Sequence, residues 1–418
     1  DHSEGAPQHV ACACFDLNQC GCTHTIYRLS ALHEHRFKVA MEGSDSEGRE
    51  VVQTQSWYFY RGPVEDKQAF AQKCCLFAGS NNLALAEGVA HYLGVPLCNA
   101  KVTRFADSEV SVEVLDMVRG RDVFLLQSAS RGFPGSSVND SLMELVLFVS
   151  ALRRASAQSV TVILPYYGYA RQDRRMTQAA IAAADVAQIL TGAGISRLLV
   201  MDLHSPQIQG FFPTSVPVEH LSAVSLAASY FAEQGLHDAV VVSPDAGGVA
   251  RAKEFRATLQ SVGRSLGSIA EQSSDQGLAM FFKQRSGASK IERMDLAGSV
   301  RDQNVILVDD ILDTAGTLCA AAAECKRHGA RRVFAFCTHG LLSGEAPRRL
   351  AEACVAGHFE YIVVADTVPQ QPWAEWCAAC GDLPVPRLKI LSVAALLAEV
   401  VKRLGCNQPL DLRVASRL

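Results

Sequence analysis

The sequence predicts an α/β protein of two similar lobes, each a mainly parallel sheet flanked by helices, with an N-terminal extension. From Cys74 onward, short apolar runs bounded by turn residues alternate with longer segments of helical periodicity, which is typical of parallel strands joined by crossover helices. The short runs are apolar throughout, as expected when both faces of a sheet are covered. A length of 418 residues exceeds what one hydrophobic core usually organises, and this favours two lobes.

The expected elements follow one another in order along the chain. Strands are expected at Cys74–Ala78, Asp122–Gln127, Val160–Pro165, Leu198–Asp202, Ala239–Ser243, Val305–Val308, Arg332–Cys337 and Tyr361–Ala365. Helices are expected at Ala84–Leu93, Ser141–Ala155, Ile181–Leu190, Ala223–Glu233, Thr317–His328 and Val393–Leu404. The pattern restarts near residue 220, so we expect a first lobe over 73–220 and a second over 221–404. Ligands should bind at the carboxyl ends of the strands. The Gly- and Ser-rich segment Gly263–Gly277 should be an exposed, mobile insertion.

The N-terminal extension, residues 1–72, shows no sustained strand or helix periodicity, and its role is unknown. It contains a set of residue types that bind metals, namely Cys12, Cys14, Cys20, Cys22, His24, His33 and His35. Because its Cys-x-Cys pairs lack the two-residue separation of zinc knuckles, we do not expect a metal site there.

The composition excludes two classes of partner. A formal net charge of -4 gives no basic surface for nucleic acid. The most apolar stretches are short or interrupted by charges, below the roughly 20 residues that a membrane span needs. We therefore expect a globular protein that binds neither nucleic acid nor membrane. Its 14 cysteines are scattered, several through apolar segments, which fits free thiols in a reducing compartment.

One segment carries the sharpest chemical signal. An apolar strand that begins at Val305 is followed by carboxylates and by a turn of small residues at the start of a helix. The residues of this segment are Asp309, Asp310, Asp313, Thr314, Ala315, Gly316 and Thr317. Amides and hydroxyls at a helix start can bind a phosphate, while the acids would face ribose hydroxyls or a metal. Alternatively, Asp313 and Thr314 cap the helix and the two preceding acids lie in a solvated turn. The segment resembles the diphosphoribose-binding loop that phosphoribosyltransferases and ribose-phosphate pyrophosphokinases share.

Four further segments distinguish between these two families. They are Arg104–Glu109, Tyr169–Arg175, Met201–His204 with Gln207–Phe212, and Val242–Gly248. In this order they resemble a ribose-phosphate pyrophosphokinase over about Cys74 to Val400. The resemblance implies two phosphoribosyltransferase-like lobes, and transfer of the pyrophosphoryl group of ATP to C1 of ribose 5-phosphate with Mg2+ for nucleotide biosynthesis. The chain has no Gly-x-x-x-x-Gly-Lys-Ser/Thr loop, so ATP requires a different cradle.

The resemblance assigns roles to individual residues. It places Arg171 and Gln172 beside the phosphates and adenine of ATP, and Phe105, Asp107 and Glu109 at a nucleotide bound by a neighbouring subunit. That implies a homo-oligomer with a shared ATP site, a hexamer as in the family. The segment Phe281–Arg285 resembles the start of a mobile catalytic loop, in which Lys283 and Arg285 stabilise the transition state.

Three residues are expected to contact metal. The resemblance assigns His204 to the metal, and a neutral imidazole also suits a phosphate contact, with Asp202 orienting the ring. Asp245 ends an apolar strand before Gly247-Gly248, which permits close approach of a ligand, and is expected to hold metal and ribose hydroxyls. Alternatively, His204 is a buried histidine hydrogen-bonded to the backbone, and Asp245 lies in an ordinary turn at the end of a strand.

The segment Met176–Ala182 is shorter and less charged than the family pattern, so feedback regulation is expected to be altered. This favours an alternative, a catalytically weak regulatory subunit, whereas Asp245, Asp313, Lys283 and Arg285 disfavour it. A phosphoribosyltransferase would not need the Arg171–Arg175 and Lys283–Arg285 segments. The tail, 405–418, ends in Ser416-Arg417-Leu418, close to a peroxisomal Ser-Lys-Leu address, so a peroxisome-type organelle such as a glycosome is expected, with the cytoplasm as alternative.

Overall fold

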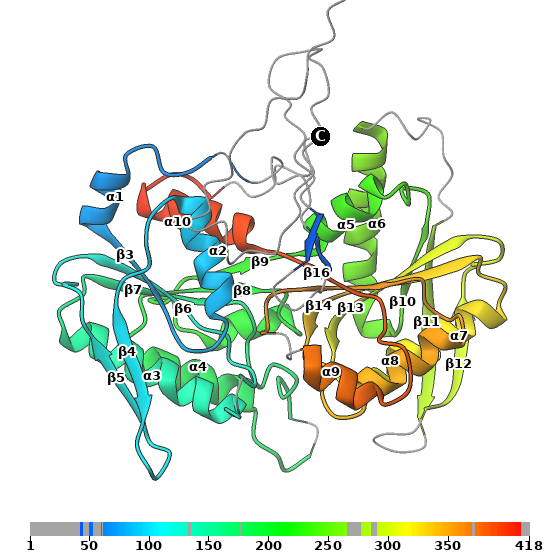
Figure 1. Ribbon diagram of the computed structural model, residues 1–418, viewed down its shortest axis with the longest axis horizontal. Coiled ribbons are helices and arrows are strands. Elements are labelled where there is room, and N and C mark those ends of the chain that lie inside the picture. The colour runs from blue at the N-terminus through cyan, green and yellow to red at the C-terminus, as the bar shows by residue number, and fades with distance from the viewer. Residues whose placement is uncertain are drawn as a thin grey trace, which may run out of the picture.

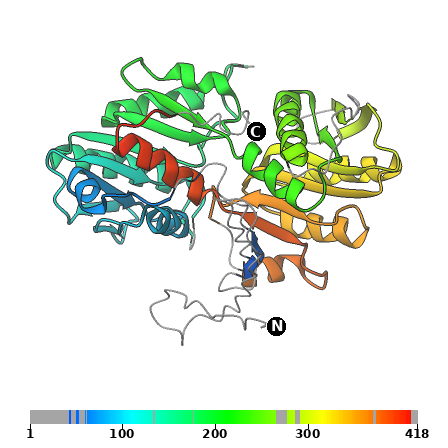
Figure 2. The same ribbon diagram turned by 90° about the horizontal axis from the view of Figure 1, so that it is seen from above.

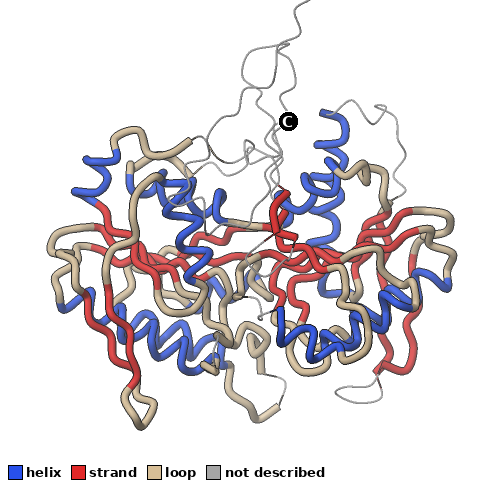
Figure 3. The backbone as a smooth tube through the Cα atoms, viewed as in Figure 1, coloured by secondary structure: helices blue, strands red, loops and turns tan. Residues whose placement is uncertain are grey.

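The computed structural model describes residues 42–44, 50–52, 60, 62–132, 135–175, 177–265, 277–285, 291–369 and 373–410. The chain forms two α/β lobes whose sheets lie side by side (Figures 1 and 3). The predicted fold class is confirmed. The Cys and His set of the N-terminal extension, Met176 and the terminal Ser416–Leu418 lie outside the described residues.

The first lobe has a five-stranded, fully parallel sheet in the order β3-β6-β7-β8-β9. Its strands are β3 (Cys74–Ala78), β6 (Asp122–Leu126), β7 (Ser159–Leu164), β8 (Arg197–Met201) and β9 (Val218–Leu221). Its main helices are α2 (Leu83–Leu93), α3 (Val138–Arg154) and α4 (Ala182–Ala193), and the helix η2 (Pro206–Phe211) lies between β8 and β9. Successive strand residues face opposite sides, so Leu76 and Phe77 enter separate apolar clusters above and below the sheet.

The second lobe has a nine-stranded sheet in the order β1-β2-β16-β15-β14-β13-β10-β11-β12. These strands are β1 (Glu42–Ser44), β2 (Glu50–Val52), β10 (Val240–Ser243), β11 (Leu278–Arg285), β12 (Ile291–Ala297), β13 (Asn304–Leu312), β14 (Arg332–Gly340), β15 (Ile362–Ala365) and β16 (Leu388–Leu391). Its helices are η3 (Ala246–Gly248), α5 (Val224–Glu233), α6 (Val249–Ser265), α7 (Gly316–Arg327), α8 (Ala346–Val355) and α9 (Trp373–Cys380). Helices α5 and α6 cover one face, and α7 and α8 cover the other (Figure 1).

Two segments pack against a lobe that the sequence did not suggest. Strand β2, from the N-terminal extension, pairs in parallel with β16 of the second lobe. Helix α10 (Ala394–Gly405), which we expected in the second lobe, lies on α2 and α1 (Lys67–Lys73) of the first (Figure 2). Lys73 Nζ donates to the carbonyl of Gly405 at 3.1 Å, and Lys402 Nζ to that of Gly62 at 2.7 Å. The apolar residues of α10 face α2, which explains this placement.

Two further differences concern segments near the predicted site. A hairpin of β4 (Ala100–Arg104) and β5 (Val110–Val114) projects from the first lobe (Figure 1) and is tied to α3 by an ion pair of 2.9 Å between Arg104 and Asp140. Gly263 to Ser265, which we expected to begin an insertion, instead form the last turn of α6, and 266–276 lie outside the described residues. Among the described residues, no helix is long and apolar enough to cross a membrane.

Candidate active site

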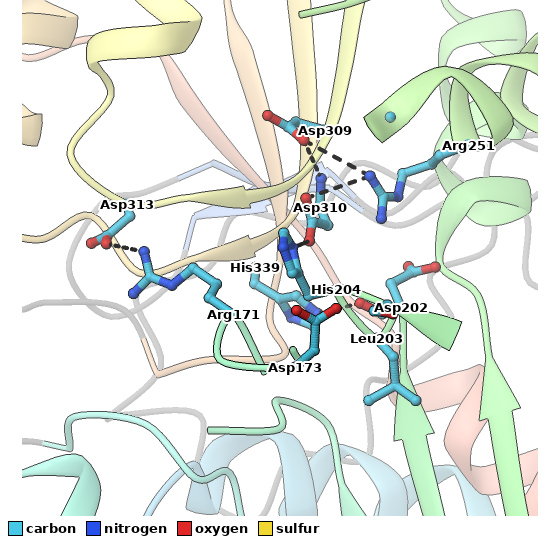
Figure 4. Close-up of polar contacts among 12 residues, drawn as sticks. Arg171, Asp173, Asp202, Leu203, His204, Arg251, Asp309, Asp310, Asp313 and His339 are labelled. Atoms are coloured by element: carbon cyan, nitrogen blue, oxygen red, sulfur yellow. Dashed lines mark hydrogen bonds and ion pairs between the residues drawn. The ribbon is translucent and has the colours of Figure 1, made fainter. Parts of the chain in front are cut away.

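The carboxyl ends of strands from both lobes meet at the junction of the lobes. Strand β8 of the first lobe ends at Met201 and leads directly into Asp202 and His204, while β13 of the second lobe carries Asp309 and Asp310 (Figure 4). Parallel strands gather such residues at one edge of a sheet, which is where ligands bind in open α/β folds. The predicted residues of the two lobes are thus brought together.

Asp310 lies between two cationic side chains. His204 Nδ1 lies 2.7 Å from its Oδ2, and Arg251 Nη1 lies 3.4 Å from its Oδ1 (Figure 4). Burial alone would raise the pKa of Asp310, but the hydrogen bond to His204 and the charge of Arg251 hold that pKa well below its usual range. The same hydrogen bond raises the pKa of His204 and favours its charged form.

Asp309 is less well compensated than its neighbour. Burial and the adjacent charge of Asp310 raise the pKa of Asp309 well above its usual range, and the charge of Asp245 adds to this effect. Arg251 Nη1 lies 3.8 Å from Asp309. Sequence reasoning missed Arg251, which lies in the first turn of α6 directly after the Asp245-Ala246-Gly247-Gly248 segment. Arg251 could have been predicted as a site residue because it is a cation in the first turn of a helix that follows an acidic, glycine-rich turn.

The predicted sugar-phosphate loop connects β13 to α7. Ala315 has a left-handed conformation with φ 62°, and no side chain caps α7, whose residues are all described. The alternative in which Asp313 and Thr314 cap the helix is therefore wrong. Arg349 of α8 donates to the carbonyl of Thr314 at 2.9 Å and so stabilises the turn. The first amides of α7 are left without a side-chain acceptor, which suits a phosphate.

Arg171 of the first lobe reaches this loop. Its Nη1 lies 2.6 Å from Asp313 Oδ2, across the junction (Figure 4). The turn that carries Arg171 is fixed by backbone bonds, since the Gln172 amide donates to Tyr169 at 2.9 Å and the Gln172 carbonyl accepts from Ala183 at 3.2 Å. The structure therefore joins the predicted ATP segment to the predicted sugar-phosphate segment by an ion pair.

Asp202 does not orient His204 through its carboxylate, so that expectation is corrected. The buried Asp202 carboxylate accepts from the Ser222 hydroxyl, the Ala223 amide and the Thr338 hydroxyl at 2.8, 2.8 and 2.7 Å. Asp310 contacts the imidazole instead. Three donors therefore bind the Asp202 carboxylate, and the metal contact that we predicted for it stays a prediction.

Asp245 lies close to the acidic pair of β13. It follows β10, and its Oδ1 accepts the amide of Gly248 at 3.1 Å, which fixes the start of the turn before α6. Among the described residues, no group of three or more His, Cys, Asp or Glu side chains is arranged to hold a metal ion.

The remaining predicted residues lie outside this cluster. Phe105, Asp107 and Glu109 occupy the tip of the β4–β5 hairpin, where Phe105 is 61% exposed. Lys283 and Arg285 lie on β11, whose pairing with β12 shifts register between Gln284 and Arg285. Strand β11 pairs with β10 so that Met280 lies opposite Ser243, which places Lys283 beyond the carboxyl end of β10 and beside the Asp245 turn. The side chains of Lys283 and Arg285 are outside the described part of the structure.

Comparisons with known proteins agree with these features. A family model described as the N-terminal domain of ribose phosphate pyrophosphokinase matches residues 74–194, and one described as a phosphoribosyl synthetase-associated domain matches residues 281–411. Ribose-phosphate pyrophosphokinase of Marinomonas sp. (strain MWYL1) is 41% identical over 80% of this chain and 96% of its own length. That of Burkholderia pseudomallei (strain K96243) is 42% identical over 79% of this chain and 93% of its own length.

A solved structure shares the fold. The crystal structure of phosphoribosylpyrophosphate synthetase from Mycobacterium smegmatis matches with a TM-score of 0.66 and 36% identity, over 80% of this chain and 99% of that one. The match covers both lobes and leaves out about a fifth of this chain. The chain therefore belongs to the ribose-phosphate pyrophosphokinase family.

Proposed function

We propose that this chain transfers the pyrophosphoryl group of ATP to the C1 hydroxyl of ribose 5-phosphate, giving AMP and 5-phosphoribosyl 1-diphosphate for nucleotide biosynthesis. The observation that carries the proposal is the contact of 2.6 Å between Arg171 and Asp313. It joins the segment expected to bind ATP to the segment expected to bind the sugar phosphate. A direct transfer between two bound substrates requires such a meeting point, because the reacting atoms must lie within about 3–3.5 Å of each other.

The sugar phosphate would occupy the start of α7. The uncapped amides from Gly316 and the hydroxyls of Thr314 and Thr317 would receive the 5-phosphate, and the helix dipole favours its negative charge. Asp309 and Asp310 lie on the preceding strand, where their carboxylates can accept hydrogen bonds from ribose hydroxyls. A ligand that brings hydrogen-bond donors or a cation to Asp309 would stabilise its charged form and so lower its pKa.

ATP would lie on the first-lobe side of the junction. Arg171 and Gln172 flank the position where its phosphates face the sugar, and His204 presents Nε2 while Nδ1 is held by Asp310. Because its pKa is raised, His204 suits a phosphate oxygen better than a metal ion. The hairpin tip with Phe105, Asp107 and Glu109 would complete the ATP site of a neighbouring subunit, in a homo-oligomer.

The residues present fit a magnesium ion. Mg2+ usually takes one or two protein carboxylates and fills its other positions with water and substrate phosphates, so a three-ligand protein cage is not needed. Asp245, with its turn beside the crowded Asp309, would hold the ion. When bound, Mg2+ neutralises charge on the phosphoryl oxygens of ATP.

Lys283 and Arg285 would supply the remaining positive charge. Their place on β11, beyond the carboxyl end of β10 and beside the Asp245 turn, would let two cations reach the site. Charge on the transferring phosphoryl group develops in the transition state, and fixed cations there lower the barrier more than they tighten substrate binding.

The decisive experiment measures AMP release by the purified chain from ATP and Mg2+, with and without ribose 5-phosphate, while the phosphorylated sugar product is followed. We expect AMP only with ribose 5-phosphate, in equal amount to the product. Folded chain that binds ATP but releases no AMP would instead support the regulatory-subunit alternative, and consumption of the diphosphate product with a nucleobase would indicate a phosphoribosyltransferase.

A further inference from the structure

Asp202 connects the two lobes behind the candidate active site. It is buried and has a left-handed φ of 35°, a conformation that side-chain-bearing residues rarely adopt. Two consecutive residues of β14, from the opposite lobe, hold it. The Thr338 hydroxyl donates to the Asp202 carboxylate at 2.7 Å, and His339 Nε2 lies 3.1 Å from the Asp202 carbonyl oxygen.

The direction of the His339 hydrogen bond is fixed by its partner. A carbonyl oxygen can only accept, so Nε2 carries the proton and donates to Asp202. On the other side of the ring, Nδ1 lies 2.9 Å from the Thr367 hydroxyl, which follows β15. The Tyr166 ring packs edge-on against the imidazole with centroids 5.0 Å apart. His339 is thus held on three sides, and it presents one donor to one backbone carbonyl.

This arrangement has a direct consequence for His204, which lies two residues beyond Asp202. The Leu203 amide between them donates to His220 Nε2 at 2.9 Å, so the backbone is anchored at consecutive residues before His204. The imidazole of His204 then lies 2.7 Å from Asp310. A release of Asp202 toward ordinary φ values would redirect the chain and carry His204 away from Asp310 (Figure 4).

We propose that Thr338 and His339 are positioning residues: they hold Asp202 in its left-handed conformation and thereby place His204 against Asp310 for its contact with ATP. Thr338 and His339 are both buried, so they would act through Asp202. The clamp acts across the junction, so the second lobe sets the geometry of a first-lobe residue. The part that concerns ATP rests on the proposed function, whereas the placement of His204 against Asp310 does not.

The test compares Thr338→Val with Thr338→Ser and a matched control. Valine has nearly the shape of threonine but cannot donate, while serine keeps the donor. Ser128→Ala is the control, because the Ser128 hydroxyl also bonds across the junction, to the Thr367 carbonyl at 2.7 Å, without contacting Asp202. His339→Gln serves as a second conservative variant, since its amide nitrogen can replace Nε2 as donor.

Two readouts follow in each folded variant. In the substrate-free protein, the imidazole NMR signals of His204, assigned with His204→Asn, should shift in Thr338→Val and stay in place in Thr338→Ser and Ser128→Ala. Affinity for an Mg2+-loaded non-hydrolysable ATP analogue should fall about tenfold in Thr338→Val, with ribose 5-phosphate affinity unchanged. In a His204→Ala background, Thr338→Val should weaken the analogue no further.

The outcomes separate the clamp from the proposed function. Unmoved His204 signals in Thr338→Val, or an equal loss of affinity in both backgrounds, would overturn the clamp. Equal losses in Thr338→Val and Ser128→Ala would do the same, because they would reveal only general weakening of the junction. A wild-type chain that binds no ATP analogue would contradict the proposed function, while the NMR comparison would still decide the clamp.

Discussion

Arg171 joins the two segments that we propose bind the substrates, through its ion pair with Asp313. It is 51% exposed and its partner Asp313 is 23% exposed, so water screens their ion pair. Exposed pairs of this kind contribute about 0–1 kcal/mol to stability. The value of the contact therefore lies in holding the ATP and sugar-phosphate segments at a fixed separation.

We predict that Arg171→Ala lowers kcat/KM for ATP at least about tenfold, because phosphate loses a charged donor (~1.5–3 kcal/mol). The free energy of unfolding should change by less than about 1 kcal/mol. Steady-state kinetics and urea unfolding measure both quantities. The control is Arg348→Ala, which removes an exposed ion pair with Glu352 on α8 and should leave kcat/KM unchanged. Wild-type kinetics in Arg171→Ala would contradict the assignment.

Asp366 gives a prediction about pH. It follows β15, and its Oδ1 accepts the Val393 amide at 2.8 Å, just before α10. Burial raises the pKa of Asp366 from 3.8 to about 6. Because the folded pKa exceeds the unfolded one, the favourable contribution of this group is present below about pH 4 and is lost as pH rises through about 6.

Asp366→Asn should therefore stabilise the protein at pH 7 to 8 by roughly 1–2 kcal/mol, since asparagine keeps an acceptor for Val393 without a buried charge. The gain should shrink as pH is lowered from 6.5 toward 4.5. Denaturant unfolding at several pH values measures this trend. Glu352→Gln, at an exposed position, should change stability by less than about 0.5 kcal/mol. A gain that does not vary with pH would refute the explanation.

At the scale of elements, the sequence predicts position better than extent. Eight predicted strands lie where apolar runs indicated them, but β13 and β14 continue past Val308 and Cys337 to Leu312 and Gly340. Their pairing persists from Asp309 opposite Cys337 to Ile311 opposite His339. We ended the two predicted strands at their first polar residues, because an apolar pattern marks only apolar positions. It cannot show that polar residues further along the strand find hydrogen-bond partners in the other lobe.

Other elements were missed for a different reason. Helix α6 was missed although its Ala, Arg and Lys residues favour a helix, and its last residues, Gly263 to Ser265, were assigned to the expected insertion. The β4–β5 hairpin was missed because its strands are short, alternate polar and apolar residues, and do not belong to either central sheet. Arg251 was missed together with its helix. Site residues on strongly patterned strands, such as Asp310 and His204, could be predicted.

The packing of α10 on the first lobe gives a third prediction. A methyl group on Gly405 would collide with the Phe70 ring and lie 3.1 Å from Cys74 Sγ. Gly405→Ala should destabilise the protein by about 1–3 kcal/mol through overpacking. Gly192→Ala, in α4, meets nothing within 4 Å and should be neutral or stabilise by up to about 1 kcal/mol. Thermal unfolding compares the two, and equal melting temperatures would contradict this packing.

At the scale of the whole molecule, the position of the β4–β5 hairpin supports our proposal that the ATP site is shared between subunits. The hairpin with Phe105 at its tip projects away from the junction that holds Arg171 and Asp310 (Figure 1). A tip so placed cannot serve the site of its own chain without a large rearrangement. A partner subunit would bring it there.

We therefore predict complementation between two inactive variants. Asp107→Ala should disable the site that receives its tip, and Lys283→Ala should disable the site on its own chain. When the two proteins are dissociated and reassembled together, mixed pairs contain some sites with both residues intact. Ribose-dependent AMP release should then rise well above that of either variant alone. Lack of any increase, in mixtures shown by mass spectrometry to contain both chains, would indicate a site formed within one subunit.

The two-lobe plan could be predicted because the strand and helix pattern restarts near residue 220. The crossings of β2 and α10 could not, since sequence patterns place an element beside its neighbours in the chain. Strand β2 lies next to β16, and α10 next to α2, only because apolar faces far apart in sequence match each other. Such long-range pairings are fixed by packing rather than by local propensity.

The return of α10 to the first lobe also affects how the chain is made. Ala86, Val89 and Leu93 of α2 face Val400 and its neighbours, which are translated roughly 300 residues later. At about 5–20 residues per second, the ribosome needs roughly 15–60 s to supply them. During that time the apolar face of α2 is left uncovered in the newly made first lobe. Completion of the first lobe therefore waits until α10 has been translated, and the nascent chain is a natural client for a chaperone that shields such an apolar face.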